Sequence, residues 1–315
     1  MGTKTHRKIL LAVDGSDQAL EAIRYAGAVF PPEHTKIVLF NVGIGFQDLI
    51  SDMDGNPLYQ SKKGKVMGWL ADNQLTMGEF REIALKTLSD AGFDSDAVEV
   101  RIQEQKTGIL ADIVQESYQD YSAVVMGQSG TSRLKDMVVG SLANKLVGKI
   151  KHMPLVIVSG KSTSDKILVG LDHSIEAKRV VSSIAELTGA TNPKITLCHA
   201  LKLPGMFHFS TGNLTLSEKE QDWLEYQKKE FMPCMDEAKN RLQEAGVAPS
   251  NISHDFIALR GDPVQRIIQK TYEEKVGTIA VGRRDAVSFA EAHFRGRFSG
   301  KIIKMLEDMA VWIVS

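Results

Sequence analysis

The stretch KILLAVDGS, Lys8–Ser16, returns later in the chain as KILVGLDHS, Lys166–Ser174. Three more stretches recur in the same order: residues 36–42 return at 194–200, residues 123–127 at 278–282, and residues 154–159 at 310–315. Four matches in one order indicate two copies of one folding unit. We therefore predict two domains, residues 1–160 and 161–315, joined near the small polar stretch 160–164.

Each copy alternates short, continuous apolar runs with longer segments typical of helices. Continuous apolar runs are expected where both faces of a parallel sheet are covered. The runs predict strands near residues 8–13, 36–42, 98–104, 122–126, 154–158, 166–171, 194–200, 252–258, 278–281 and 311–314. A helix is expected after Ser16, which can cap it, and further helices are expected over residues 66–91, 109–118, 142–151 and 218–245. The pattern predicts an α/β fold: two tandem copies of an open, mostly parallel five-stranded sheet sandwiched by helices.

Composition excludes several classes of protein. The 315 residues include 38 Lys and Arg and 39 Asp and Glu, a net charge of −1, so no nucleic-acid partner is expected. No run approaches the roughly 18 apolar residues of a membrane span, so no membrane partner is expected. The two cysteines, Cys198 and Cys234, cannot build a disulfide framework or a cysteine-rich metal site. We therefore expect a cytoplasmic protein without a metal site of its own.

Candidate ligand-binding residues follow the first and fourth strands of the first copy. Asp14 comes directly after the first strand, Gly127 ends the fourth, and Gly140 and Ser141 open the last helix. Ligands of open parallel sheets bind at the carboxyl ends of the strands, where the strand order reverses. Glycines allow the backbone to approach a ligand, and free N–H groups at a helix start attract phosphate. Asp14 could accept hydrogen bonds from ribose hydroxyls.

Competing motifs are absent from the sequence. No G-x-x-x-x-G-K-[ST] occurs, so the chain is not a P-loop ATPase. No G-x-G-x-x-G follows the first strand. The stretch Gly127–Thr131, GQSGT, misses a nucleophile elbow because its fifth residue is Thr.

The spacing G-x2-G-x9-G-[ST], met by Gly127, Gly130, Gly140 and Ser141, resembles the ATP-binding signature of the universal stress protein family. The resemblance extends to the opening Lys8–Ser16 and to the closing Pro-Leu-Val-Ile-Val of residues 154–158, and with both copies it covers nearly the whole chain. It implies a Rossmann-like, adenine-nucleotide alpha-hydrolase-like fold, a tandem arrangement and ATP as the ligand. An Mg²⁺ ion carried by the phosphates remains open.

The resemblance also implies roles for individual residues. Those that would line the adenosine are Ala12, Val13 and Asp14, with Val42 holding adenine through its backbone. Those that would wrap the ribose and the first phosphate are Met126, Gly127, Ser129 and Gly130. Those that would meet the remaining phosphates are Gly140, Ser141, Leu142 and Ala143. Ala143 stands where nucleotide-binding members often carry a hydroxyl residue.

The second copy departs from this signature. Gly282 matches Gly127, but Asp285 stands in place of Gly130, and Arg297 replaces Ser141 through a one-residue insertion. A carboxylate at Asp285 would repel phosphate. We expect a degenerate site there, and a different small ligand remains open because Asp172 is kept.

The resemblance, together with these residues, predicts a stress-response regulatory protein that binds ATP in its first domain. No histidine or acidic pair is placed as a base beside Ser129 or Ser141, so no catalytic residue is assigned. The alternatives are a slow ATPase or autophosphorylating enzyme, and a small-molecule sensor that uses the second domain. We expect an unidentified protein partner and an intramolecular pseudo-dimer through the final strands, 155–158 and 311–314; a homodimer remains open.

Overall fold

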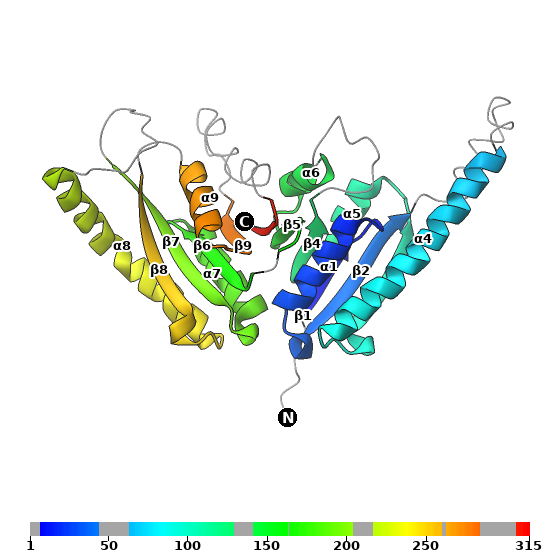
Figure 1. Ribbon diagram of the computed structural model, residues 1–315, viewed down its shortest axis with the longest axis horizontal. Coiled ribbons are helices and arrows are strands. Elements are labelled where there is room, and N and C mark those ends of the chain that lie inside the picture. Colours follow the sequence, from blue (N-terminus) through cyan, green and yellow to red (C-terminus); the bar gives the residue numbers. More distant parts are fainter. Residues whose placement is uncertain are drawn as a thin grey trace. The chain divides into compact units, whose positions relative to one another are not determined.

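The computed structural model describes residues 7–43, 63–128, 141–162, 164–203, 217–259, 263–283 and 307–315, with residues 63–76, 141, 202 and 263 described by their backbone alone. The chain divides into two units, Met1–Ile150 (unit 1) and Lys151–Ser315 (unit 2). Each alternates strands and helices, as Figure 1 shows. The α/β fold predicted from the repeat is confirmed.

Unit 1 holds a parallel sheet in the order β3-β2-β1-β4. In chain order its elements are β1 (Arg7–Ala12), α1 (Asp17–Val29), β2 (Thr35–Gly43), α4 (Lys63–Asp90), β3 (Val98–Glu104), α5 (Ile109–Ser117), β4 (Ala123–Gly127) and α6 (Ser141–Lys149). The central strand β1 pairs with both β2 and β4, and Ile9, Leu10 and Leu11 within it are fully buried. The strand order places the carboxyl ends of β1 and β4 side by side.

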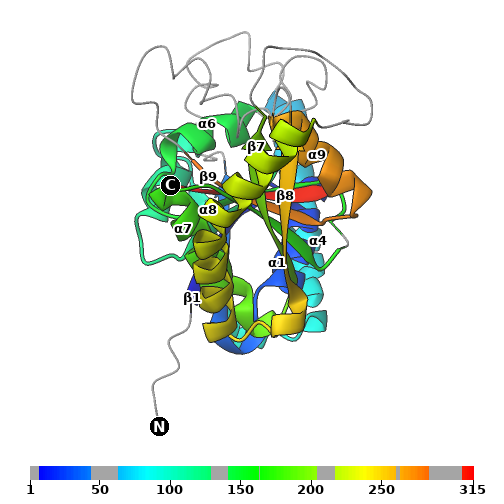
Figure 2. The same cartoon turned by 90° about the vertical axis from the view of Figure 1, so that its left-hand side faces the viewer.

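Unit 2 holds a sheet in the order β5-β10-β9-β6-β7-β8. In chain order its elements are β5 (Leu155–Ser159), β6 (Lys166–Leu171), α7 (Ile175–Thr188), β7 (Lys194–Lys202), α8 (Glu218–Glu244), β8 (Ile252–Leu259), α9 (Pro263–Glu273), β9 (Thr278–Gly282) and β10 (Met309–Val314). Figure 2 shows α8 and α9 on opposite sides of β8. The helices of this unit therefore cover both faces of its sheet.

The final strands of the two repeats pair with each other, as expected from their apolar sequences. β5 belongs by sequence to the first repeat, yet it lies in unit 2 and runs antiparallel to β10. Val156 pairs with Trp312, which is fully buried. All the other strand pairs described in the two units are parallel.

The helix that follows the first strand of each repeat begins at a capping serine. The Ser16 hydroxyl accepts a hydrogen bond from the Ala19 N–H at 3.1 Å, and Ser174 accepts from Ala177 at 3.2 Å. Such a cap satisfies one of the N–H groups that have no partner within the helix. The cap predicted at Ser16 is confirmed.

No helix within the described ranges combines the length and the apolar character that crossing a membrane requires.

Candidate functional site at the carboxyl edge of β1 and β4

The site predicted in unit 1 begins at the turn that follows β1. The Asp14 carboxylate accepts a hydrogen bond from the Ser16 N–H at 3.1 Å, and the Val13 N–H donates to the Phe40 carbonyl oxygen at 2.9 Å. Asp14 is exposed, whereas Val13 is buried. The turn therefore holds an ionisable oxygen acceptor at the edge of the sheet with its backbone fixed on both sides.

A second contact fixes this turn from β2. The Asn41 side chain donates from Nδ2 to the Val13 carbonyl oxygen at 2.8 Å. Asn41 and its neighbour Val42 are half-buried at the carboxyl end of β2. Sequence reasoning missed Asn41; the signal available to it was the alignment of Asn41 with His199, another side chain able to donate a hydrogen bond.

Gly15 has a conformation that favours glycine, with φ of +79°. A Cβ atom at this position would lie 2.8 Å from the Met77 sulfur. Met77 on α4 thus packs directly over the turn that carries Asp14. Any larger residue at position 15 would have to displace the Met77 side chain.

Gly127 ends β4 where the strand meets the first turn of α1. A Cβ atom on Gly127 would lie 2.8 Å from the backbone carbonyl carbon and oxygen of Gln18. Gly282 in unit 2 has the same constraint, with the Glu176 Cβ 2.8 Å away. Because both repeats need this glycine for packing, its presence alone does not indicate a ligand.

The structure brings together six of the sequence-predicted residues. Ala12 pairs with Met126 across β1 and β4, so Val13, Asp14 and Gly127 follow at the same edge. Met126 is buried, with 5% of its surface exposed. Val42 joins them from the end of β2 through its neighbour Asn41.

The phosphate side of the predicted site is described only in part. Ser141 is the first residue of α6, Leu142 is half-buried and Ala143 is fully buried. The buried Ala143 methyl group packs inside unit 1, and this explains an apolar residue at that position. Three of the predicted residues lie outside the described ranges: Ser129, Gly130 and Gly140.

Unit 2 repeats the turn with other side chains. Asp172 accepts a hydrogen bond from the Ser174 N–H at 2.8 Å, and His199 Nδ1 lies 2.7 Å from the Leu171 carbonyl oxygen. A carbonyl oxygen only accepts, so Nδ1 carries the proton of a neutral His199. Burial is the largest of the effects that lower the pKa of His199, and the neighbouring His173 lowers it further. His199 thus does for Leu171 what Asn41 does for Val13.

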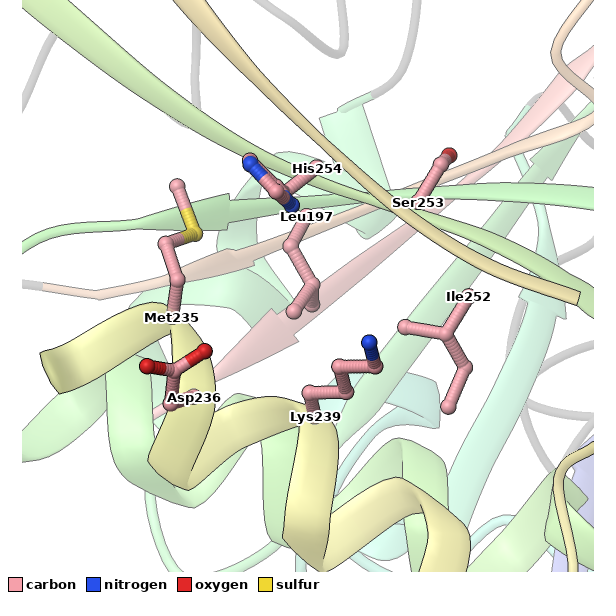
Figure 3. A pocket seen from close by; sticks show the side chains of 7 residues that line it. All are labelled: Leu197, Met235, Asp236, Lys239, Ile252, Ser253 and His254. Carbon is pink, nitrogen blue, oxygen red and sulfur yellow. The ribbon is translucent and has the colours of Figure 1, made fainter. Parts of the chain in front are cut away.

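A small hollow lies elsewhere in unit 2, between α8 and the starts of β7 and β8. Figure 3 shows Lys239 and Asp236 on α8 across from Ile252 and His254 on β8. Its volume of about 40 Å³ leaves room for only a few water molecules, far below the ~300 Å³ of a small-molecule site. Within the described residues, no three His, Cys, Asp or Glu side chains are grouped so that they could hold a metal ion.

Comparisons with known proteins agree with this architecture. The family model described as "Universal stress protein family" matches residues 5–159 and again residues 163–307. No curated protein matches the chain. A universal stress protein from Archaeoglobus fulgidus DSM 4304 aligns over 98% of both chains at 18% identity and a TM-score of 0.57. The functionally unknown protein PA1789 from Pseudomonas aeruginosa PAO1 aligns over 99% of this chain and 93% of its own, at 13% identity and a TM-score of 0.56.

A third structure, a universal stress protein in complex with cAMP, covers 50% of this chain and 98% of its own at 18% identity and a TM-score of 0.33. The first two of these solved structures establish the fold, and the family model matches more than nine-tenths of the sequence. The chain therefore belongs to the universal stress protein family and carries two of its domains in tandem.

Proposed function

We propose that unit 1 binds ATP at the carboxyl edge of β1 and β4, and that the protein acts as a stress-response regulator through this binding. The observation that carries the proposal is the Asp14 turn. An exposed carboxylate is anchored by Ser16 at 3.1 Å, and the preceding carbonyl is anchored by Asn41 at 2.8 Å, at the place where open parallel sheets bind ligands.

The residues divide by the chemistry that they can offer to the nucleotide. Asp14 would accept hydrogen bonds from the ribose hydroxyls, and Val42 would meet the adenine through its backbone. The N–H groups at the start of α6, from Ser141 to Ala143, would donate to phosphate oxygens. Mg²⁺ would accompany the phosphates.

The cytoplasm is the proposed location, and binding rather than turnover is the proposed activity. Both cysteines are free thiols, a state typical of a reducing compartment. ATP would act by favouring one conformation of unit 1 that a protein partner binds. Such a partner would respond to bound ATP and not to a product of ATP hydrolysis.

The test is nucleotide binding by the full chain and by two matched variants. Asp14→Asn should weaken ATP binding by about 10- to 100-fold, since hydrogen bonds to charged groups contribute about 1.5–3 kcal/mol. Asp172→Asn is the control, because Asp172 makes the same contact with Ser174 in unit 2. Calorimetric titration measures both, after extraction and identification of any nucleotide that co-purifies.

The proposal is wrong if ATP neither binds nor raises the melting temperature, or if Asp14→Asn binds ATP as the unmodified chain does. Phosphate release faster than about one per second would favour the enzyme alternative, because typical enzymes turn over at 1–10³ per second.

A further inference from the structure

Equivalent positions in the two units form a corner near the carboxyl ends of β1 and β2 in unit 1 and of β6 and β7 in unit 2. In unit 1 this corner, called here the unit 1 corner, consists of Gly15, Asn41, Met77 and Ile102. In unit 2 the same positions, the unit 2 corner, are His173, His199, Phe231 and Phe256.

Strand register and helix ends establish the correspondence. Asn41 pairs with Ile102 across β2 and β3, and His199 pairs with Phe256 across β7 and β8. Gly15 and His173 each follow the aspartate of the turn. The helices α4 and α8 end at matching sequences, LSDAG at residues 88–92 and LQEAG at residues 242–246, which align Met77 with Phe231.

The unit 2 corner is filled by its own rings. Phe231 is 1% exposed and stacks on His199, with ring centroids 3.5 Å apart and planes at 7°. The edge of His173 meets Phe231 at 4.8 Å, and Phe256 meets it at 6.3 Å and 86°. Stacked and edge-to-face arrangements are the favourable ones for aromatic groups. Four rings therefore occupy the ends of β6, β7 and β8 on the α8 side.

The unit 1 corner contains no ring, and the Met77 side chain packs over its Gly15 turn. Gly15 contributes no side chain, Met77 and Asn41 are half-buried, and Ile102 is 65% exposed. An isoleucine in the middle of a strand with two-thirds of its surface in water leaves an apolar face uncovered beside Val42. The face is flanked by the Asp14 turn, the group proposed to bind ribose.

We infer that the unit 1 corner receives the flat face of the nucleotide base, and that the four rings of the unit 2 corner occupy the equivalent volume. This inference rests on the proposed function. Met77 and Ile102 are then specificity-determining residues of unit 1, and Phe231 excludes a base from unit 2. The chain takes one nucleotide, held in unit 1.

The experiment transfers the rings into unit 1. Met77→Phe with Ile102→Phe should lower ATP affinity by about tenfold or more, because the two rings fill the space of the base. Ile83→Phe is the matched control on α4: Ile83 is 46% exposed and lies outside the corner, so the same added volume should leave affinity unchanged. Ile102→Phe alone is the second variant, since an exposed position accepts the ring without loss of folding.

A photoreactive nucleotide, 2-azidoadenosine triphosphate, locates the base directly in the unmodified chain. Tryptic peptides spanning residues 66–81 and 102–106 carry Met77 and Ile102, and these should be labelled. Peptides spanning residues 195–202 and 230–239 carry His199 and Phe231, and these should remain unlabelled.

One bound ATP per chain, lost in the ring variants and kept in Ile83→Phe, supports the inference. Three results would overturn the inference and leave the proposed function standing. They are two bound nucleotides per chain, labelling of the unit 2 peptides, and full ATP affinity in the ring variants. Absence of any ATP binding overturns both the inference and the proposed function. If Asp14→Asn abolishes ATP binding while the ring variants bind ATP normally, the proposed function stands and the inference is wrong.

Discussion

The Asn41 side chain holds the backbone carbonyl of Val13 at 2.8 Å, and this contact ties the end of β2 to the turn after β1. Val13 precedes Asp14, so the bond fixes the peptide group that joins Val13 to Asp14. The His199–Leu171 contact at 2.7 Å gives the second unit the same tie with a different side chain.

Removing the Asn41 tie should weaken ATP binding without unfolding the chain. Asn41→Ala leaves the Val13 carbonyl without its side-chain donor, and we expect about a tenfold loss of ATP affinity, the free-energy equivalent of about one hydrogen bond. His199→Ala, which removes the equivalent tie in unit 2, is the control and should leave ATP affinity unchanged. Calorimetric titration measures both variants; equal losses in the two would contradict a role confined to unit 1.

The glycine that ends β4 should be needed for stability whether or not a ligand is present. Gly127→Ala places a Cβ 2.8 Å from the Gln18 backbone, so the strand or the helix must shift, at a cost of about 1–3 kcal/mol in the free energy of unfolding. Gly148→Ala is the control, since a Cβ there meets no atom within 4 Å and lies in α6. Urea unfolding should show destabilisation for the first variant and a gain of up to about 1 kcal/mol for the second.

The stability of the second unit should fall in mild acid. The pKa of His199 is lowered in the folded state, chiefly by burial and further by His173. The unfolded chain therefore binds more protons, and stability is lost as the pH falls below the unfolded value of about 6.5. His199→Asn keeps a donor for Leu171 but has no such titration.

Thermal unfolding between pH 7.5 and 5 checks this expectation. The midpoint should fall more steeply with acid in the unmodified chain than in His199→Asn. Parallel curves for the two proteins would show that the acid sensitivity comes from other groups.

A buried carboxylate should fix the connection between β3 and α5. Asp112 accepts hydrogen bonds from the N–H groups of Lys106 and Thr107, at 2.8 and 3.1 Å, and from the Thr107 hydroxyl at 2.8 Å. Burial alone would raise the pKa of Asp112, but these hydrogen bonds outweigh it and the pKa is lowered. The stability that Asp112 contributes is present above its unfolded pKa and is lost as the pH falls through the folded one.

Asp112→Asn should destabilise the chain by about 2 kcal/mol at neutral pH, because hydrogen bonds to a charged acceptor are replaced by weaker ones. Asp120→Asn is the control, an exposed aspartate close in sequence. Denaturant unfolding compares the two, and equal midpoints would contradict the assignment.

The fold was predictable because the strands are continuous apolar runs that occur twice. The runs near 8–13 and 98–104 became β1 (Arg7–Ala12) and β3 (Val98–Glu104), and the cap at Ser16 is where the sequence indicated. The nearly invariant right-handed crossover then limits the topologies that alternating strands and helices can adopt.

The site was predictable only where it depends on backbone position. Asp14 and Gly127 meet because parallel strands end at one edge. Asn41, Met77 and Phe231 were missed because their roles depend on packing across elements, which spacing along the chain does not reveal. The second site was predicted to be degenerate from Asp285 and Arg297, which lie outside the described ranges. The closure inferred on the base side depends instead on the rings of His199 and Phe231.

The antiparallel pairing of β5 with β10 affects how the repeats can be cut apart. Every residue of β10 is buried, and β5 covers one of its edges. A fragment that starts at residue 161 would expose that apolar edge and invite aggregation, whereas one that starts at residue 151 retains its cover. The last strand of the first repeat, β5, thus covers the sheet edge of β10 in the second repeat.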